Sequence, residues 1–304
     1  MPKTFIIGTR DSKLAVWQAE WVAKKLNENG QETRLKYIKT EGDLVLDTPL
    51  PMMGGKGVFT KALDDALFIG EIDLAVHSLK DIPTQIPGGL VIGAIAKRED
   101  HRDVLVARNG LAFLDDPNYE GIIASSSNRR MSQWLERYPK HKMTDIRGNV
   151  QTRLRKLKES HWDGAIFAAA GLIRLKLEHK ADQYLDWMIP APAQGAMAVM
   201  TREDDLETQK NLTPLHDAHT ALCTKIERDY LNALEGGCSA PIGAFAKVIN
   251  NQVYLKANIM NPDGSGRIDV EFSSDIKQAH QMGNQAAQIA RKKGADAIVS
   301  RLRE

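Results

Sequence analysis

Short apolar runs that alternate with amphipathic segments constrain the fold of this chain more than any other feature of its sequence. Four such runs in the first third are short enough to be buried strands: Thr4–Gly8, Leu35–Ile38, Ile72–Val76 and Leu90–Ala96. Between these runs, apolar residues recur at helical spacing and predict two helices, which end at Gly30 and Gly70. We expect the first helix to bury Leu14, Trp17, Trp21 and Leu26. This order predicts a parallel or mixed sheet with helices on both faces.

The same pattern then restarts further along the chain. Three further strands are predicted, at Val104–Ala107, Ile122–Ser125 and Ala165–Ala169, and another strand-like run covers Ala196–Met200. Helices are predicted around Asn128–Arg137 and Asn149–Glu159. Two similar α/β lobes joined by crossings near 97–103 and 190–196 would form a pair with a cleft between them.

The last part of the chain differs in kind. A helix near 217–233 leads into a hairpin of Val253–Met260 and Arg267–Phe272, and a final helix is predicted over 275–293. The turn between the two strands contains Pro262 and Gly264. A hairpin flanked by helices predicts a small α+β unit.

Charge and cysteine content narrow the function classes. Hydrophobic residues make up 42% and charged residues 26%, which is ordinary for a soluble globular protein. The net charge is only +2, yet residues 121–180 contain 13 Lys and Arg against 5 Asp and Glu. This local excess predicts an anionic ligand or partner. The chain has only two cysteines, and their spacing does not suit a metal site. The first residues do not resemble a signal peptide, and no apolar run is long enough to span a bilayer. These features favour the cytoplasm.

The most specific phrase is Leu234–Gly243, in which Gly236 and Gly237 precede Cys238. Two glycines free the backbone to present the thiol on an exposed turn. In a basic setting such a cysteine can ionise and act as a nucleophile. A purely structural cysteine at a turn is the alternative. Cys223 lies inside a helical pattern and is expected to be a small core residue.

The phrase Val76–Pro83 places polar groups at the carboxyl end of a strand, where open α/β sheets bind ligands. Asp81 beside Lys80 is a candidate acid/base group, because the neighbouring cation favours the charged carboxylate. An ordinary loop ion pair is the alternative. His77 is expected to pack or to form a hydrogen bond at the strand end.

Arginines and hydroxyls gather at strand ends and helix starts in the second lobe. They occur in Ser125–Arg130, in Arg147–Arg153 and at Arg174. Free helix amides, hydroxyls and arginines together suit a carboxylate or phosphate ligand. A basic helix face in water is the alternative for each arginine alone. Gly54–Gly57 lacks the spacing of a P-loop, so we interpret it as a mobile loop that carries Lys56 toward the cleft, or as a plain connector.

These phrases occur together, and in this order, in hydroxymethylbilane synthases, also called porphobilinogen deaminases. The chain resembles that family over nearly its whole length. The other matching phrases are Gly8–Ser12, Trp17–Ala19, Gly54–Phe59, Ala169–Leu172 and Gln194–Ala196.

The resemblance implies an α/β fold with two lobes like those of type II periplasmic binding proteins, a cleft, and a small C-terminal α+β domain. Domain 1 is expected to comprise residues 1–98 with 196–216, and domain 2 residues 101–191. Domain 3, residues 217–304, would carry the cofactor cysteine.

The family's chemistry implies a role for each candidate residue. Cys238 would hold a dipyrromethane cofactor through a thioether, and Asp81 would be the catalytic carboxylate of a transferase that condenses four porphobilinogen molecules with loss of ammonia and then releases linear hydroxymethylbilane. The arginines would bind the acetate and propionate groups of the growing chain: Arg10, Arg129, Arg130, Arg147, Arg153 and Arg174. Lesser cofactor or substrate contacts would come from Ser12, Lys56, Ser78, Lys80 and Ser126.

The resemblance further implies a monomeric enzyme of tetrapyrrole biosynthesis, without nucleic-acid or membrane partners, that hands its product to uroporphyrinogen-III synthase. Three positions depart from the family: Asn128, Ala193 and Ala233 replace a usual leucine, a usual glycine and a frequent arginine. The alanine at 193 would stiffen a segment between the lobes and limit their motion. Two other functions compete with the enzyme: a non-catalytic two-lobed binding protein for an anionic small molecule and a nucleic-acid-binding protein. Cys238 argues against the first, and arginines at strand ends suit carboxylates better than nucleic acid.

Overall fold

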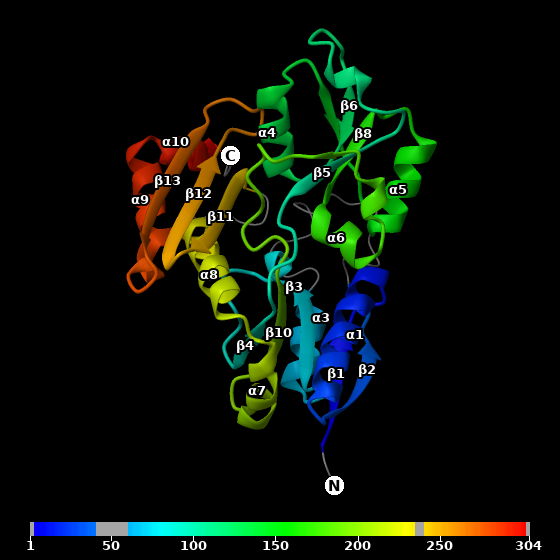
Figure 1. The fold of residues 1–304 in the computed structure, drawn as a ribbon, viewed down its shortest axis with the longest axis vertical. Coiled ribbons are helices and arrows are strands. Elements are labelled where there is room, and N and C mark those ends of the chain that lie inside the picture. Colours follow the sequence, from blue (N-terminus) through cyan, green and yellow to red (C-terminus); the bar gives the residue numbers. More distant parts are fainter. Residues whose placement is uncertain (1–2, 41–59, 235–239, 302–304) are drawn as a thin grey trace. The chain divides into compact units, whose positions relative to one another are not determined.

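The computed structural model describes residues 3–40, 60–234 and 240–301. The chain forms two compact units (Figure 1). Unit 1 comprises Met1–Glu99 and Ala196–Ala221, and unit 2 comprises Asp100–Gly195 and Leu222–Glu304. The expected domains 2 and 3 both fall mainly in unit 2, and their separation into two domains stays a proposal.

Unit 1 is built on one five-stranded mixed sheet. Its strands are β1 (Thr4–Thr9), β2 (Glu32–Tyr37), β3 (Leu74–Ser78), β4 (Leu90–Ile95) and β10 (Met197–Arg202). The strand order is β2-β1-β3-β10-β4, in which β10 runs antiparallel to both of its neighbours. The predicted mixed sheet is therefore confirmed, and the late strand β10 completes it.

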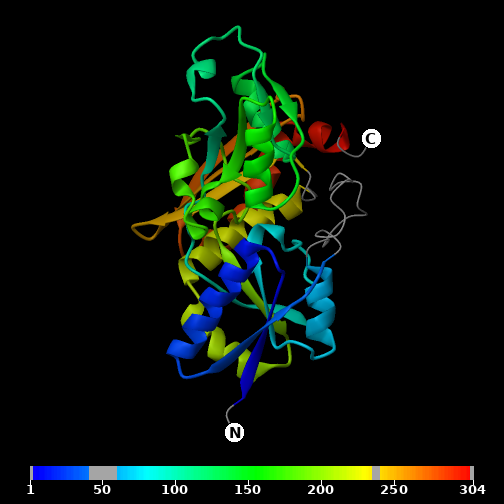
Figure 2. The ribbon, with the colours of Figure 1, turned by 90° about the vertical axis from the view of Figure 1, so that its right-hand side faces the viewer.

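Helices cover both faces of this sheet. They are α1 (Lys13–Glu28), α3 (Lys61–Phe68) and α7 (Leu206–Leu212). Figure 2 shows α1 and α3 on opposite faces. Phe5 and Ile7 of β1 share a core with Val22 of α1. On the other face Gly8 permits a close approach, because a Cβ there would lie 2.9 Å from Cδ2 of Leu63 in α3.

The face that α1 buries differs from the one predicted. Its buried residues are Ala15, Gln18, Ala19, Val22 and Leu26. Of the predicted residues only Leu26 is among them, and Leu14, Trp17 and Trp21 are half-buried. Apolar residues occupy more than half of this helix's circumference, so periodicity alone did not identify the inner face. The small side chains of Ala15 and Ala19 let the helix lie close to the sheet.

Unit 2 contains a second five-stranded sheet with the same plan. Its strands are β5 (Asp103–Ala107), β6 (Ile122–Ala124), β7 (Lys142–Thr144), β8 (Gly164–Ala168) and β9 (Gln183–Tyr184). The order β7-β6-β8-β5-β9 again places an antiparallel strand, β5, in the fourth position. The helices between these strands are α4 (Asn128–Arg137), α5 (Val150–Glu159) and α6 (Ala169–Arg174). The restart of the sequence pattern therefore corresponds to a second sheet with the same arrangement of strand directions.

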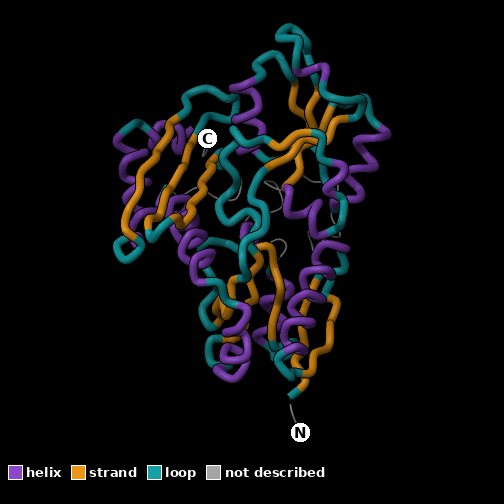
Figure 3. The backbone as a smooth tube through the Cα atoms, viewed as in Figure 1, coloured by secondary structure: helices purple, strands orange, loops and turns teal. Residues whose placement is uncertain are grey.

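The C-terminal part of unit 2 has three strands where a two-stranded hairpin was expected. β11 (Ile242–Ile249), β12 (Gln252–Ile259) and β13 (Ile268–Asp275) form an antiparallel meander. The helices α9 (Met282–Lys292) and α10 (Ala295–Arg301) belong wholly to this part. A third helix, α8 (Ala218–Ala233), begins in unit 1 and enters this part at Leu222. Figure 3 shows α9 and α10 beside this sheet, and buried residues of these helices and strands form one core. The final helix was predicted to begin at residue 275, but the chain first forms the 3-10 turn Ala279–Gln281.

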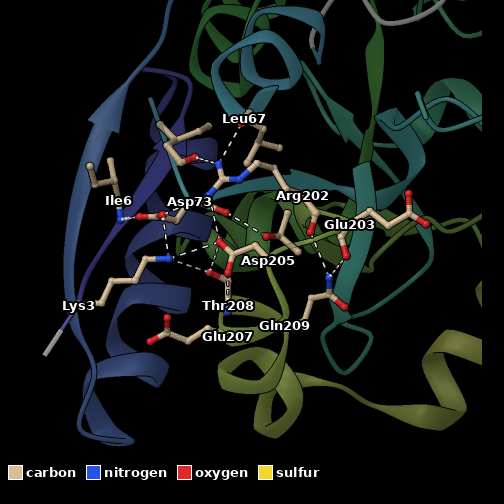
Figure 4. Close-up of polar contacts among 12 residues, drawn as sticks. Lys3, Ile6, Leu67, Asp73, Arg202, Glu203, Asp205, Glu207, Thr208 and Gln209 are labelled. Atoms are coloured by element: carbon tan, nitrogen blue, oxygen red, sulfur yellow. Dashed lines mark hydrogen bonds and ion pairs between the residues drawn. The ribbon is translucent and has the colours of Figure 1, made fainter. Parts of the chain in front are cut away.

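An ion-pair network ties the amino ends of β1 and β3 to the end of β10 (Figure 4). Nζ of Lys3 lies 3.2 Å from Oδ1 of Asp73 and 3.4 Å from Oδ2 of Asp205. Nη2 of Arg202 lies 3.0 Å from Oδ2 of Asp205. Oδ2 of Asp73 also accepts a 2.8 Å hydrogen bond from the backbone N of Ile6. This network holds the sheet at the end opposite to the carboxyl ends of its parallel strands.

Within the described ranges, no helix combines the length and the apolar character that crossing a membrane requires.

Candidate active site

The carboxyl ends of β1 and β3 lie side by side in unit 1. These strands are parallel neighbours, with Ile7 opposite Leu74. Arg10 follows β1 directly and is half-buried. Ser12 caps α1, where its Oγ accepts a 3.3 Å hydrogen bond from the backbone N of Ala15. Both candidates therefore lie at the edge where open α/β sheets bind ligands.

The neighbouring loop carries three more candidates. Ser78 ends β3, and Lys80 and Asp81 lie in the 3-10 turn η2 (Leu79–Asp81). Oγ of Ser78 accepts a 3.0 Å hydrogen bond from Nε2 of Gln18 in α1. Because Gln18 is buried, this bond fixes the end of β3 to the helix and so fixes where the turn begins.

The carboxylate of Asp81 is exposed. Within the part of the chain that the structure describes, it forms no hydrogen bond and no ion pair, including with Lys80. The alternative of a loop ion pair between Lys80 and Asp81 is therefore not supported. A carboxylate in this state can accept a hydrogen bond from a ligand N–H and balance a positive charge on that ligand.

His77 packs inside the sheet, as the sequence led us to expect. Its side chain is 6% exposed, and its Nε2 is a buried atom without a hydrogen-bond partner among the described residues. Burial, and secondly the positive charge of Arg10, lower the pKa of His77 to about 4. The imidazole is therefore neutral at neutral pH and adds no charge to this edge of the sheet.

In unit 2, Ser126 connects two strand-end loops. It follows β6, and its Oγ donates a 3.0 Å hydrogen bond to the carbonyl oxygen of Ile146. The same Oγ accepts a 2.9 Å hydrogen bond from the backbone N of Ile146. Ser126 therefore holds the segment that carries Arg147 against the start of α4.

Arg129 and Arg130 lie in the first turn of α4 and are 4% and 6% exposed. Both guanidinium groups contact the carboxylate of Asp103. Nη1 of Arg129 donates to Oδ2 of Asp103 at 2.7 Å, and Nε of Arg130 donates to Oδ1 at 2.8 Å. A basic helix face in water is therefore excluded for this pair, and a buried ion cluster takes its place.

Asp103 is the site residue that sequence reasoning missed. It is the first residue of β5 and pairs with Ala168 at the end of β8. Because β5 is antiparallel to β8, its first residue lies where the parallel strands of this sheet end. The available signal was a carboxylate directly before the buried run Val104–Ala107, since a buried charge needs charged or hydrogen-bonding partners.

The remaining arginines of unit 2 lie next to a glycine or donate a hydrogen bond to a glycine carbonyl. Arg147 precedes Gly148, which has a φ of 110°, and Nε of Arg153 donates a 2.7 Å hydrogen bond to the carbonyl oxygen of Gly148. Arg174 ends α6 and is 6% exposed, and its Nη2 donates a 2.6 Å hydrogen bond to the carbonyl oxygen of Gly195. Backbone carbonyls therefore help to orient the guanidinium groups of Arg153 and Arg174.

Ala193 adopts a backbone conformation that favours glycine. Its φ is 65° and it is fully buried. The left-handed region costs a residue with a Cβ about 1–2 kcal/mol. Its backbone N donates a 2.7 Å hydrogen bond to Oε2 of the buried Glu227, which holds it in place. The effect of this alanine on motion between the lobes stays a prediction.

Two candidates, Lys56 and Cys238, lie outside the described residues. Cys223 is buried and belongs to the core of the C-terminal part, as expected.

Comparison with known proteins gives a family for this arrangement. The family model described as "Porphobilinogen deaminase, dipyromethane cofactor binding domain" matches residues 5–210, and "Porphobilinogen deaminase, C-terminal domain" matches residues 221–292. The chain belongs to the porphobilinogen deaminase family. The resemblance predicted from the motifs is thereby confirmed.

Members of the porphobilinogen deaminase family match the chain from end to end. The porphobilinogen deaminase of Syntrophotalea carbinolica is 43% identical over 97% of this chain and 95% of its own length. That of Chloroherpeton thalassium is 42% identical over 100% of this chain and 99% of its own length. Among solved structures, the probable amino-acid ABC transporter extracellular-binding protein ytmK of Bacillus subtilis is 12% identical with a TM-score of 0.44, covering 71% of this chain and 90% of that one.

The first family description names a dipyrromethane cofactor, and the described residues fit such a group. A dipyrromethane with acetate and propionate chains presents carboxylates, which call for cationic and hydroxyl donors. Both units place donors of this kind at the carboxyl edges of their sheets. In addition, Nε of Arg129 is a buried donor that no described residue satisfies. An acceptor on the cofactor would meet that need.

Proposed function

We propose that this chain is a hydroxymethylbilane synthase that joins four porphobilinogen molecules head to tail, releases ammonia at each step, and finally releases the linear tetrapyrrole by hydrolysis. Membership of the porphobilinogen deaminase family supports this transferase activity. The single observation that carries the proposal is the exposed carboxylate of Asp81 at the carboxyl end of β3, together with donors for carboxylates at the same edge of each sheet.

Asp81 is the catalytic residue in this proposal. Its carboxylate accepts a hydrogen bond from the substrate pyrrole N–H and stabilises the positive charge that develops as the amine departs. It also serves as the acid/base group for the leaving amine and the ring α-proton. When bound to Cys238 through a thioether, the dipyrromethane supplies the nucleophilic pyrrole carbon.

The cationic side chains bind the acetate and propionate groups of substrate and cofactor. We assign this role to Arg10, Arg129, Arg130, Arg147, Arg153 and Arg174, with lesser contacts from Ser12, Lys56, Ser78, Lys80 and Ser126. Because every added pyrrole brings two carboxylates, the growing chain is a polyanion, and a series of arginines can hold it at successive lengths. We further propose a monomer in the cytoplasm, without nucleic-acid or membrane partners, that passes its product to uroporphyrinogen-III synthase.

Intact mass of the purified chain tests this proposal. The protein should be heavier than its sequence by one dipyrromethane, and the excess should map to the peptide that contains Cys238. Cys238→Ser should lack the added mass and be inactive. Cys223→Ser is the matched control and should keep both the added mass and the activity. A wild-type chain that is unmodified yet active would overturn the cofactor assignment, and an unmodified, inactive chain that binds an anionic ligand would indicate a binding protein.

A further inference from the structure

The carboxylate of Asp103 is fully buried in unit 2 and accepts hydrogen bonds from three side chains. Nη1 and Nη2 of Arg129 donate to its two oxygens at 2.7 and 3.2 Å. Nε of Arg130 and Nε2 of Gln194 donate to Oδ1 at 2.8 and 3.0 Å. The two-pronged contact fixes the plane of the Arg129 guanidinium relative to the carboxylate. We call Asp103, Arg129 and Arg130 the Asp103 cluster.

Backbone carbonyls hold the outer nitrogens of both arginines. Nη1 of Arg129 donates a 2.9 Å hydrogen bond to the carbonyl oxygen of Ile189, and Nη1 of Arg130 donates one of 2.9 Å to that of Ile166. After these bonds, Nε of Arg129 is still without a partner in the described part of the chain. A buried donor without an acceptor is unfavourable, so this atom marks a place for an acceptor from a ligand.

The charges of the Asp103 cluster do not balance. Burial raises the pKa of Asp103, but the charges of Arg129 and Arg130, with hydrogen bonds from Arg129 and Gln194, outweigh burial and hold the pKa well below its usual range. Burial lowers the pKa of Arg130, yet a guanidinium stays protonated at neutral pH. Two cations and one anion leave one net positive charge in a buried position. A second anion would complete the cluster.

We propose that Asp103 is a positioning residue, which holds Arg129 and Arg130 in the orientation that receives one carboxylate of the bound pyrrole chain. The proposal rests on the proposed function for the identity of that carboxylate. Asp103 neutralises one of the two cations and suppresses their mutual repulsion. It also fixes both guanidinium planes before the ligand arrives, which lowers the entropy that binding must overcome. Asp103 itself need not touch the substrate.

Charge variants of the cluster test whether it takes up one anion. The Cys238→Ser background cannot attach the cofactor, so its melting temperature is measured while acetate replaces chloride at constant ionic strength. The intact cluster, with one net positive charge, should gain about 2–4 °C from weak acetate binding. Asp103→Asn, with two net charges, should gain more, and Arg130→Gln, with none, should gain least. Equal gains in all three chains would overturn the proposal.

A double variant separates orientation from charge. Asp103→Asn combined with Arg130→Gln keeps the single positive charge of the wild-type cluster but lacks the carboxylate that orients Arg129. With Cys238 present, each apoprotein is incubated with porphobilinogen, and intact mass follows the rate of cofactor loading. Arg130→Gln is the matched reference, because both chains lack Arg130 and only the double variant also lacks the carboxylate. The double variant should load more slowly than Arg130→Gln by on the order of tenfold, although its cluster is more positive, since a small misplacement of a binding group has effects of that size. Loading as fast as Arg130→Gln or faster would reduce Asp103 to a counter-charge and overturn the proposal.

Asp103→Glu provides the second arm if the double variant does not fold. It keeps the charge and moves the carboxylate by one methylene group, so the acetate response should persist while loading slows. Wild-type loading by Asp103→Glu would contradict a positioning role. If the wild-type chain itself gains no mass, the proposed function fails, whereas the acetate series still decides whether the cluster binds an anion.

Discussion

The two five-stranded sheets share one pattern of parallel and antiparallel strands, but Asp81 and Asp103 at their edges lie in opposite environments. In unit 1, Asp81 lies in the turn after β3, exposed and without a partner among the described residues. In unit 2, Asp103 opens the antiparallel strand β5, fully buried and bound to two arginines. The corresponding first residue of the antiparallel strand in unit 1 is Met197, opposite Ser78.

The environment of a carboxylate therefore determines what that carboxylate can do. A carboxylate with open lone pairs can bind a substrate N–H and move a proton. A carboxylate whose oxygens are already saturated by guanidinium groups can only hold those groups in place. Under the proposed function, the same edge of the sheet supplies a reactive acid in unit 1 and, by our inference, a residue that positions cations in unit 2.

The largest effect is expected on turnover, from substitution of the exposed carboxylate in unit 1. Asp81→Asn should lower turnover by at least about 10²–10³-fold, because it removes charge stabilisation and basicity together. Its melting temperature should stay at the wild-type value, because the carboxylate has no partner to lose. Asp81→Glu keeps the charge and should retain part of the activity. Turnover of Asp81→Asn within about tenfold of wild type would remove Asp81 from the mechanism.

On the unit 2 side the expected effect is on folding. Asp103→Asn should lower the free energy of unfolding by about 3–5 kcal/mol, because two buried cations lose their anion. Denaturant unfolding measures this change. Asp186→Asn is the matched control, since its pair with Arg102 is solvent-exposed and should contribute no more than about 1 kcal/mol. Equal, small losses for both variants would mean that the Asp103 cluster is not a stabilising centre.

The buried His77 should make the stability of the protein depend on pH. Its folded pKa of about 4 lies below the ordinary value of 6.5, so protonation favours the unfolded chain. The contribution of the neutral imidazole to the free energy of unfolding is fully present above pH 6.5 and is lost as the pH falls toward 4. Between pH 7 and 4.5, wild type should lose about 1–3 kcal/mol more stability than His77→Leu. Parallel pH curves for the two proteins would show that this histidine is not buried as a neutral group.

The smallest effect is expected at the opposite edge of unit 1. Lys3→Gln breaks ion pairs with Asp73 and Asp205 whose members are partly exposed, so the free energy of unfolding should fall by no more than about 1 kcal/mol. Arg202 remains beside both carboxylates in that variant. A loss as large as that of Asp103→Asn would mean that burial does not explain the difference between the two charge clusters.

Local patterns were sufficient to predict most strands of both sheets and several candidates at their edges. Apolar runs located most strands, and polar residues at the ends of β3 and β6 led to Asp81 and Arg129, whereas Ser12 came from the family resemblance. This works because the position of a strand end follows from where its apolar run stops. The strands β7 and β9 escaped prediction because neither contains an apolar run, unlike the equally short β6.

Features that depend on long-range pairing could not be predicted. The position of Asp103 beside Arg129 and Arg130 requires that β5 run antiparallel to β8, and a buried apolar run carries no information about direction. For the same reason, Arg129 and Arg130 were expected to face a ligand, and their bond to an internal carboxylate was not foreseen. The three-stranded C-terminal sheet required β11, which begins at Ile242, within the phrase Leu234–Gly243, and was not recognised as a strand.

The most direct test of the division between the two carboxylates is a paired measurement of cofactor content and melting temperature on Asp81→Asn and Asp103→Asn. Asp81→Asn should carry the dipyrromethane mass on Cys238 and melt with wild type, although it does not turn over. Asp103→Asn should melt lower and carry less cofactor. An Asp103→Asn protein with wild-type mass and wild-type melting temperature would contradict the account.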